Sequence, residues 1–153
     1  MPPINFNYAT ELSAGTAGMI ATTEPTEVIS RTNEDATLTP FGRAVFRGSN
    51  DKGATKTVAT TANAFLGVAM LDRSAYTDEL LTVEGFRQYD TIPVLRKGVV
   101  WVTTAVAVND GEPAYVTPGG VFTNVDGGGA NAATGGVFET SNSAAGLAQL
   151  RLK

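Results

Sequence analysis

Residues 90–124, which read DTIPVLRKGVVWVTTAVAVNDGEPAYVTPGGVFTN, decide the fold expected for this chain. Val, Thr and Ala dominate the first half around Trp101, the single tryptophan, and these residue types suit the pleated surface of a half-buried strand. Asn109-Asp110-Gly111 follows the run, and Asp-Gly is a strong short signal for a β-hairpin. Two more short strands are expected at 113–117 and 121–124, so the stretch predicts a β-meander with Trp101 in the core.

Strand patterns continue on both sides of this stretch. Lys97-Gly98 is expected to end a first strand at 91–96, before the run that contains Trp101. Turn signals recur about every ten residues and separate about eleven short strands, a spacing typical of an all-β barrel or sandwich. The strands outside the meander are expected at 28–31, 43–47, 65–70, 82–86, 136–140 and 146–152.

Three local features refine this expectation. The alternation in 43–47 (RAVFR) predicts Ala44 and Phe46 on one face of a strand and Val45 on the other. Gly67, inside an apolar run, predicts a bulge or a close approach of another backbone. Residues 74–81 (SAYTDELL) predict the one short helix, with Asp72 or Ser74 as its cap.

The chain has 153 residues, which is the size of one domain with a substantial core. Its N-terminal residues 1–26 are rich in Ala, Thr, Gly and Pro, and we interpret them as an extended arm that precedes a single β-rich domain at 27–153. Within the arm Ile4, Phe6 and Tyr8 alternate with polar residues, a strand pattern that needs the sheet edge of another subunit to pair with.

Composition excludes several classes of function. The chain has no Cys and no His, so disulfides, Cys or His triads and the usual zinc sites are ruled out. A net charge of −4 without a basic stripe argues against a nucleic-acid partner. No apolar run approaches the length of a membrane span, and no signal region follows the first Met, so the protein is expected to be soluble and to carry no export signal.

Carboxylates remain the only plausible catalytic groups, because a glycosidase needs just two acids facing a cleft. The candidates suit turns better: Asp110 and Asp126 directly precede Gly, where Asp accepts hydrogen bonds from local backbone. We therefore expect no enzyme activity, no cofactor, no metal and no small-molecule substrate. The glycine-rich residues 125–136 match no phosphate-binding motif and are expected to form a flexible connection.

The order of several short motifs resembles the structural cement proteins of tailed bacteriophage heads. The resemblance runs from about residue 27 to the C-terminus. The head decoration proteins of lambdoid phages are similar to this family. It is carried by residues 40–45 (PFGRAV), 65–69 (FLGVA), 89–90 (YD), 94–100 (VLRKGVV), 110–117 (DGEPAYVT), 136–140 (GVFET) and 148–152 (AQLRL).

This resemblance implies a small β-barrel or β-tulip domain, usually a homotrimer, on the outside of the expanded capsid in the virion. It implies that the partner is the major capsid protein, which the N-terminal arm contacts. We hypothesise that Ile4, Phe6 and Tyr8 anchor the arm and that acidic residues such as Glu11 meet basic patches on the shell. The alternative is a tail, baseplate or cell-surface β-rich binding module, because short-stranded domains of this composition serve those roles too.

Overall fold

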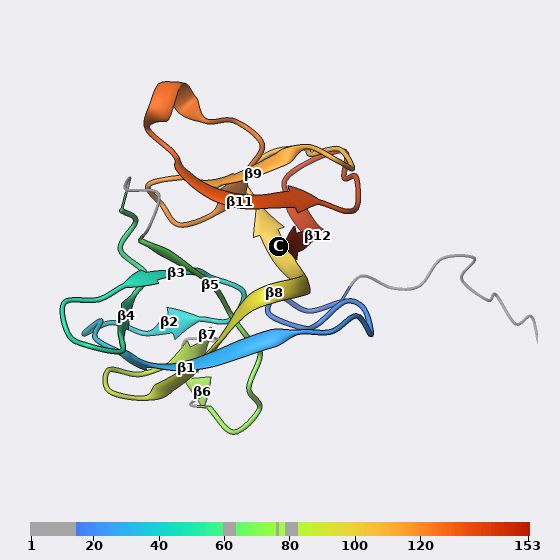
Figure 1. Cartoon of the computed structure of the whole chain (residues 1–153). Helices are drawn as coiled ribbons and strands as arrows, with labels where there is room; N and C mark the ends of the chain where they lie inside the picture. Colours follow the sequence, from blue (N-terminus) through green and yellow to red (C-terminus); the bar gives the residue numbers. More distant parts are fainter. Residues whose placement is uncertain (1–14, 60–63, 76, 79–82) are drawn as a thin grey trace, which may run out of the picture.

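The structure is a computed structural model that describes residues 15–59, 64–75, 77–78 and 83–153 (Figure 1). It confirms the all-β prediction, with a closed five-strand barrel at its core. The strands are β1 (Glu27–Asn33), β2 (Thr39–Pro40), β3 (Ala44–Arg47), β4 (Gly53–Thr55), β5 (Phe65–Ala69), β6 (Thr77–Asp78), β7 (Val83–Phe86), β8 (Thr91–Thr104), β9 (Pro113–Val116), β10 (Phe122–Thr123), β11 (Ala132–Phe138) and β12 (Gly146–Leu152), and a single 3-10 turn, η1, spans Gly127–Gly129. Among the described residues no helix is long and apolar enough to cross a membrane.

The long strand β8 belongs to two closed rings of strands. The first ring runs β1-β4-β3-β5-β8 and closes through the pairing of β8 with β1. The second runs β8-β10-β9-β11-β12 and closes through the pairing of β12 with β8. Figure 1 shows the rings as a lower and an upper lobe with β8 passing from one to the other. A small separate sheet, β2-β7-β6, lies against the first ring.

Gly98 is the point at which β8 changes partners. Lys97 pairs with Glu27 of β1, and the next residue, Gly98, pairs with Leu152 of β12. Gly98 has φ +123, which favours glycine. The strand break predicted at Lys97-Gly98 is therefore wrong, because the glycine bends one continuous strand instead of ending it.

The predicted meander is half right: β9 and β10 pair as an antiparallel hairpin, but the expected pairing of β8 with β9 is wrong. The turn signal at Asp110-Gly111 is real, since Gly111 has φ +84, but β8 and β9 on its two sides are not neighbours. β10 lies between them, parallel to β8 and antiparallel to β9. The turn residues pair elsewhere: the Gly111 N–H donates to the Phe138 carbonyl at 2.8 Å.

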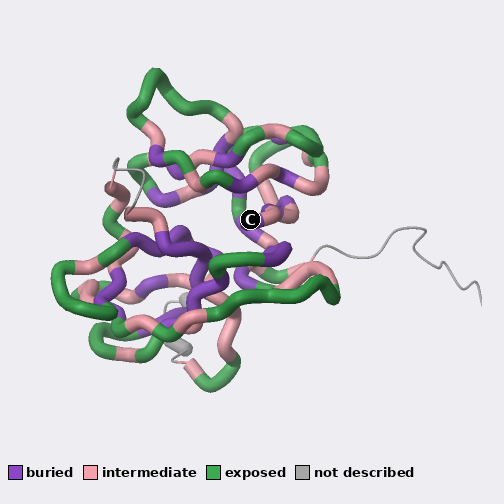
Figure 2. The backbone as a smooth tube through the Cα atoms, in the orientation of Figure 1, coloured by how far each residue is buried: buried purple, intermediate pink, exposed green. Residues whose placement is uncertain are grey.

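The apolar side chains form two buried clusters, one on each face of the first ring. Figure 2 shows buried backbone positions in both lobes. As predicted, Ala44 and Phe46 share one face of β3 and Val45 takes the other, but both faces are fully buried. Val45 packs inside the first ring together with Ala54, Leu66, Ala69, Phe86, Ile92 and Val94. Phe46 joins the larger cluster, which continues into the second ring through Val100, Val116, Phe122, Phe138 and Leu150. The larger cluster therefore contains side chains from both lobes and packs them against each other.

The prediction of a close approach at Gly67 is confirmed. Its φ is +153, and a Cβ there would lie 2.0 Å from the Leu95 carbonyl oxygen. The register of β3 against β5 also shifts between Val45 and Phe46, beside this glycine. Only a residue without a side chain lets β5 lie this close to β8.

The helix predicted at 74–81 is wrong where that segment is described. Thr77–Asp78 forms β6, which pairs with β7. The residues proposed as caps make a turn instead: the Asp72 carboxylate accepts hydrogen bonds from the Ser74 N–H at 2.9 Å and from the Ser74 hydroxyl at 2.7 Å. Such Asx turns compete with helix formation, and two helical turns have little intrinsic stability to set against them.

Candidate functional site

The described part of the N-terminal segment lies beside the upper half of β8. The Gly18 N–H donates to the Trp101 carbonyl at 2.8 Å, the Trp101 N–H donates to Met19 at 2.9 Å, and Ala21 donates to Val99 at 2.9 Å. Ile20 and Val100 form an antiparallel bridge within this ladder. Residues 18–21, which the sequence assigned to an arm, are therefore tied to the domain as a short additional strand.

The segment is also packed closely against the turn between β2 and β3. The Leu71 N–H donates to the Gly18 carbonyl at 2.8 Å. A Cβ on Gly18 would lie 2.7 Å from the Leu71 nitrogen, and one on Gly42 would lie 2.7 Å from the Ala17 Cβ. Both glycines have positive φ, +86 and +70, so the two backbones meet at positions where side chains would prevent the contact.

Trp101 lies outside the core, contrary to the sequence prediction. Its neighbours Val100 and Val102 are fully buried in the larger cluster, whereas Trp101 is half-buried on the opposite face of β8. Gly15, the first described residue, lies against the indole, because a Cβ there would be 2.4 Å from the Trp101 Cδ1. The tryptophan thus forms the surface along which the N-terminal segment runs.

Arg151 of β12 fixes the other end of the segment. Its Nη1 and Nη2 donate to the two Glu24 carboxylate oxygens at 2.5 and 2.9 Å, and its Nε donates to Glu139. The hydrogen bond from Arg151 holds the pKa of Glu24 below its ordinary value, and the two carboxylates raise that of Arg151. A bidentate arginine fixes direction as well as distance, so the segment has one defined course from residue 15 to β1.

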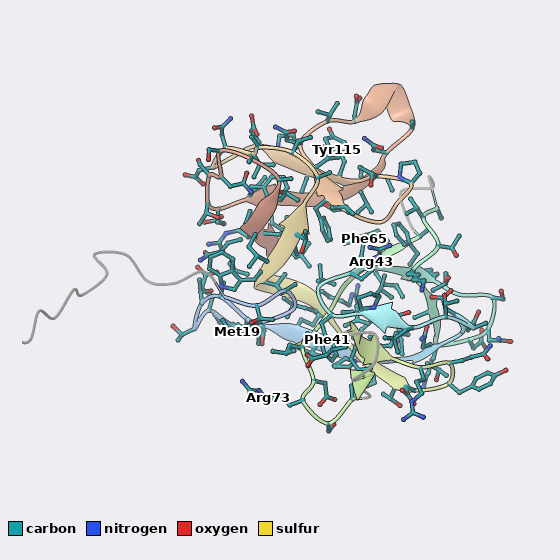
Figure 3. All side chains as sticks on the ribbon, turned by 180° about the vertical axis from the view of Figure 1, so that it is seen from behind. Met19, Phe41, Arg43, Phe65, Arg73 and Tyr115 are labelled. Atoms are coloured by element: carbon teal, nitrogen blue, oxygen red, sulfur yellow. The ribbon has the colours of Figure 1, made fainter. Side chains whose placement is uncertain are left out.

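The predicted capsid-binding residues Ile4, Phe6, Tyr8 and Glu11 lie outside the described residues, and their role stays a prediction. The first described residue, Gly15, lies next to Trp101. Figure 3 shows this side of the molecule, with Met19 on the N-terminal segment, Phe41 to its right and Arg73 below it.

The opposite end of β1 carries a second ordered surface that the sequence did not indicate. Here the β7–β8 turn presents Tyr89, a residue that is 75% exposed and has a φ of +69. The buried side chain of Asn33 holds this turn by donating from Nδ2 to the carbonyls of Phe86 at 3.1 Å and Arg87 at 3.0 Å. Tyr rarely adopts a positive φ, so the sequence did not predict this conformation.

Several carboxylates serve as loop anchors. As expected for a turn residue, the Asp126 carboxylate accepts from the Gly128 N–H at 2.9 Å. Glu34 accepts from the backbone N–H groups of Ser49 at 2.7 Å and Asn50 at 2.9 Å, and these bonds lower its pKa. Glu112 accepts from the Asn109 N–H at 2.8 Å, and this hydrogen bond lowers the pKa of Glu112. Over the described part of the chain no three acidic side chains gather into a group able to hold a metal ion.

Comparison with solved structures finds the same fold in a phage capsid. A chain of the structure described as the capsid of Myoviridae phage XM1 has the same fold, with a TM-score of 0.70 at 20% sequence identity. The similarity covers 98% of this chain and 97% of the other. No curated protein matches the sequence.

A family model settles the class. The model of the structural cement proteins (E217 gp24/Pam3 gp6) matches residues 4–153, and the chain therefore belongs to the structural cement protein family. The resemblance noted from short motifs is confirmed and extends further toward the N-terminus than those motifs did. The protein is a structural, capsid-associated component of a phage virion.

Proposed function

We propose that this protein binds the outer surface of the expanded capsid and stabilises the shell by bridging subunits of the major capsid protein. Membership of the cement family across residues 4–153 is the observation that carries the proposal. A cement protein adds strength through many shallow contacts rather than one deep pocket, and linked contacts raise avidity without any new type of interaction.

The proposed acceptor for the arm is a strand edge of the coat protein, because an arm that pairs as a strand needs an unpaired edge. Within this domain the outer edge of β1 is also open, since β1 pairs with β8 along residues 27–32 but with β4 only at Thr32 and Asn33. A neighbouring copy of this chain is therefore the competing acceptor.

The anchoring of residues 15–26 suits this role. A flexible arm loses much of its binding free energy to ordering, and the loss shrinks when the point of attachment is fixed. Trp101 and Arg151 fix that point at both ends of the described segment. Backbone hydrogen bonds made by the arm would each contribute roughly 0.5–1.5 kcal/mol net.

A homotrimer is part of the proposal. Three copies around a threefold position would present three arms to three coat subunits, and the summed contacts would resist outward pressure from packaged DNA. Light scattering by the purified protein, with and without expanded capsids, reports both self-association and shell binding.

Deletion of residues 1–10 tests the arm. The variant keeps Gly15 to Thr26 and with them the ladder on β8, so its melting temperature should match that of the unmodified protein. We expect occupancy of expanded capsids to fall sharply at physiological salt. Unchanged occupancy would remove the arm, with Ile4, Phe6, Tyr8 and Glu11, from the binding surface.

A further inference from the structure

The β7–β8 turn is built around a tyrosine in an unfavourable backbone conformation. Tyr89 occupies the third position of the turn that begins at Arg87, and the Asp90 N–H closes it by donating to the Arg87 carbonyl at 3.1 Å. Its φ of +69 favours Gly or Asn and is costly for a bulky side chain. A strained residue that the surrounding structure fixes in place points to a use for its side chain.

Buried contacts fix the turn. The Tyr89 N–H donates to the Asn33 carbonyl at 2.7 Å, and the Asn33 N–H donates to the Asp90 carbonyl at 2.9 Å. The Asp90 carboxylate in turn accepts from the Arg87 N–H at 2.7 Å. Asn33 is fully buried, so the position of the Tyr89 backbone is set by the barrel itself. The ring is therefore presented in advance, with little loop-ordering cost on binding.

A second strained residue lies on the other side of the same strand end. Lys52 has φ +61, and its carbonyl accepts from the Thr32 N–H at 3.1 Å, one residue before Asn33. The two positive-φ residues other than glycine in the described chain, Lys52 and Tyr89, are thus both held by the last two residues of β1. This end of the barrel, defined by Arg31, Lys52, Arg87 and Tyr89, is called the tyrosine tip below.

Three of the four residues that define the tyrosine tip are basic, on a chain that is negative overall. Lys52 and Arg87 are exposed, and Arg31 and Lys52 both line a hollow beside β1. Most acidic side chains at this end are hydrogen-bonded within the loops: Glu34 accepts from Ser49 and Asn50, Asp35 from Thr55 and Lys56, and Asp90 from the Arg87 N–H. Asp51 is exposed.

We infer that the tyrosine tip is a second capsid-binding surface, in which Tyr89 inserts into an apolar recess rimmed by carboxylates on a coat-protein subunit. The inference rests on the proposed function and names the chemistry of the contact. Exposed aromatic side chains on rigid supports dominate the binding energy of interfaces, and flanking charges set orientation and association rate.

The position of the tip explains how one small domain bridges two subunits. β1 runs from Glu27, beside the attachment of the N-terminal segment, to Asn33 at the tip. At about 3.3 Å per residue these ends are roughly 20 Å apart. Figure 1 shows the N-terminal segment and the β7–β8 turn at opposite ends of β1. This separation would let the arm and the tip contact two different coat subunits.

The test measures binding to expanded shells of the phage that lack this protein. Tyr89→Asn removes the ring but keeps a residue that accepts φ +69, so the variant should melt at or above the temperature of the unmodified protein. We expect its affinity for the shells to fall roughly tenfold or more. Tyr89→Phe keeps the ring and should bind nearly normally. Val125→Asn is the matched control, since Val125 is 53% exposed in the loop between β10 and η1.

Lys52→Asp tests the charge, because Asp also tolerates a positive φ. We expect weaker binding than normal, with the difference shrinking as salt rises. Normal binding of Tyr89→Asn would overturn the inference while leaving the proposed function intact, whereas failure of the unmodified protein to bind would overturn both. Dissociation of a free homo-oligomer by Tyr89→Asn would also overturn it, by assigning the ring to self-association.

Discussion

The Arg151 guanidinium holds the Glu24 carboxylate through hydrogen bonds of 2.5 and 2.9 Å across 127 residues of sequence. It joins the last strand to the segment that precedes the first one. Arg151 also donates to Glu139, and this second contact fixes the orientation of the guanidinium that Glu24 accepts from. The finding identifies the residue that sets the course of the N-terminal segment.

Replacement of Arg151 tests this assignment. Arg151→Gln should leave the barrel folded, with a small fall in melting temperature, but speed hydrogen exchange at the amides of Gly18 and Ala21. Arg96→Gln is the control, since Arg96 pairs with Glu27 of a strand that β8 already holds. Equal exchange in both variants would show that the backbone ladder alone fixes the segment.

Acid should weaken the fold through the anchoring carboxylates. Hydrogen bonds from Arg151, from Ser49 and from Asn109 lower the pKa of Glu24, Glu34 and Glu112 respectively below 4.5. A carboxylate with a lowered folded-state pKa contributes stability that is fully present above the unfolded value and is lost as pH falls through the folded value.

Melting temperatures should therefore be level near neutral pH and decline below about pH 4.5. Glu34→Gln should lower the melting temperature at pH 7 and flatten the decline, because one of the titrating groups is gone. A protein that melts equally at pH 7 and pH 3 would contradict the anchoring role of these carboxylates.

Phe46 tests whether the larger cluster unites the two lobes. Its ring is fully buried and meets Phe65 edge-on, with centroids 5.8 Å apart. Phe46→Ala should reduce the free energy of unfolding by about 3–5 kcal/mol in denaturant titrations. The transition should stay single if the lobes unfold together, and two separate transitions would show that they are independent. Val125→Ala, at an exposed site, should change stability by less than about 0.5 kcal/mol.

Gly67 tests the contact between β5 and β8. Gly67→Ala places a Cβ 2.0 Å from the Leu95 carbonyl oxygen, so strand β5 must move. We expect a loss of about 1–3 kcal/mol in the free energy of unfolding. Gly119→Ala is the control, because its nearest atom would be at an ordinary 3.7 Å. Equal effects of the two changes would mean that the close approach is not needed.

Period-two patterns predicted the strands well, because they depend on burial alone. The two faces of β3 and the closeness at Gly67 were both predicted from residue types. Pairing partners were not predictable in the same way. Asp110-Gly111 makes a turn, but β8 pairs with β10 and not with β9, the next strand in the sequence. The glycine at 98 was misread because a bend and a break have the same local signal.

The candidate site was less accessible from sequence than the fold. Trp101 stands in an apolar run whose alternate residues face opposite sides, and only the partner segment at Gly15 shows which side is outer. Tyr89 has an ordinary sequence context, and its conformation comes from Asn33, more than fifty residues earlier. Both depend on contacts between distant parts of the chain.

Cement binding to a surface created by capsid expansion can be measured directly. Purified protein is co-sedimented with expanded and with unexpanded shells, and the bound copies are counted against coat protein. We predict saturable binding to expanded shells, in proportion to the coat protein, and little binding to unexpanded ones. Equal binding to both, or a few copies confined to the tail of intact virions, would contradict the account.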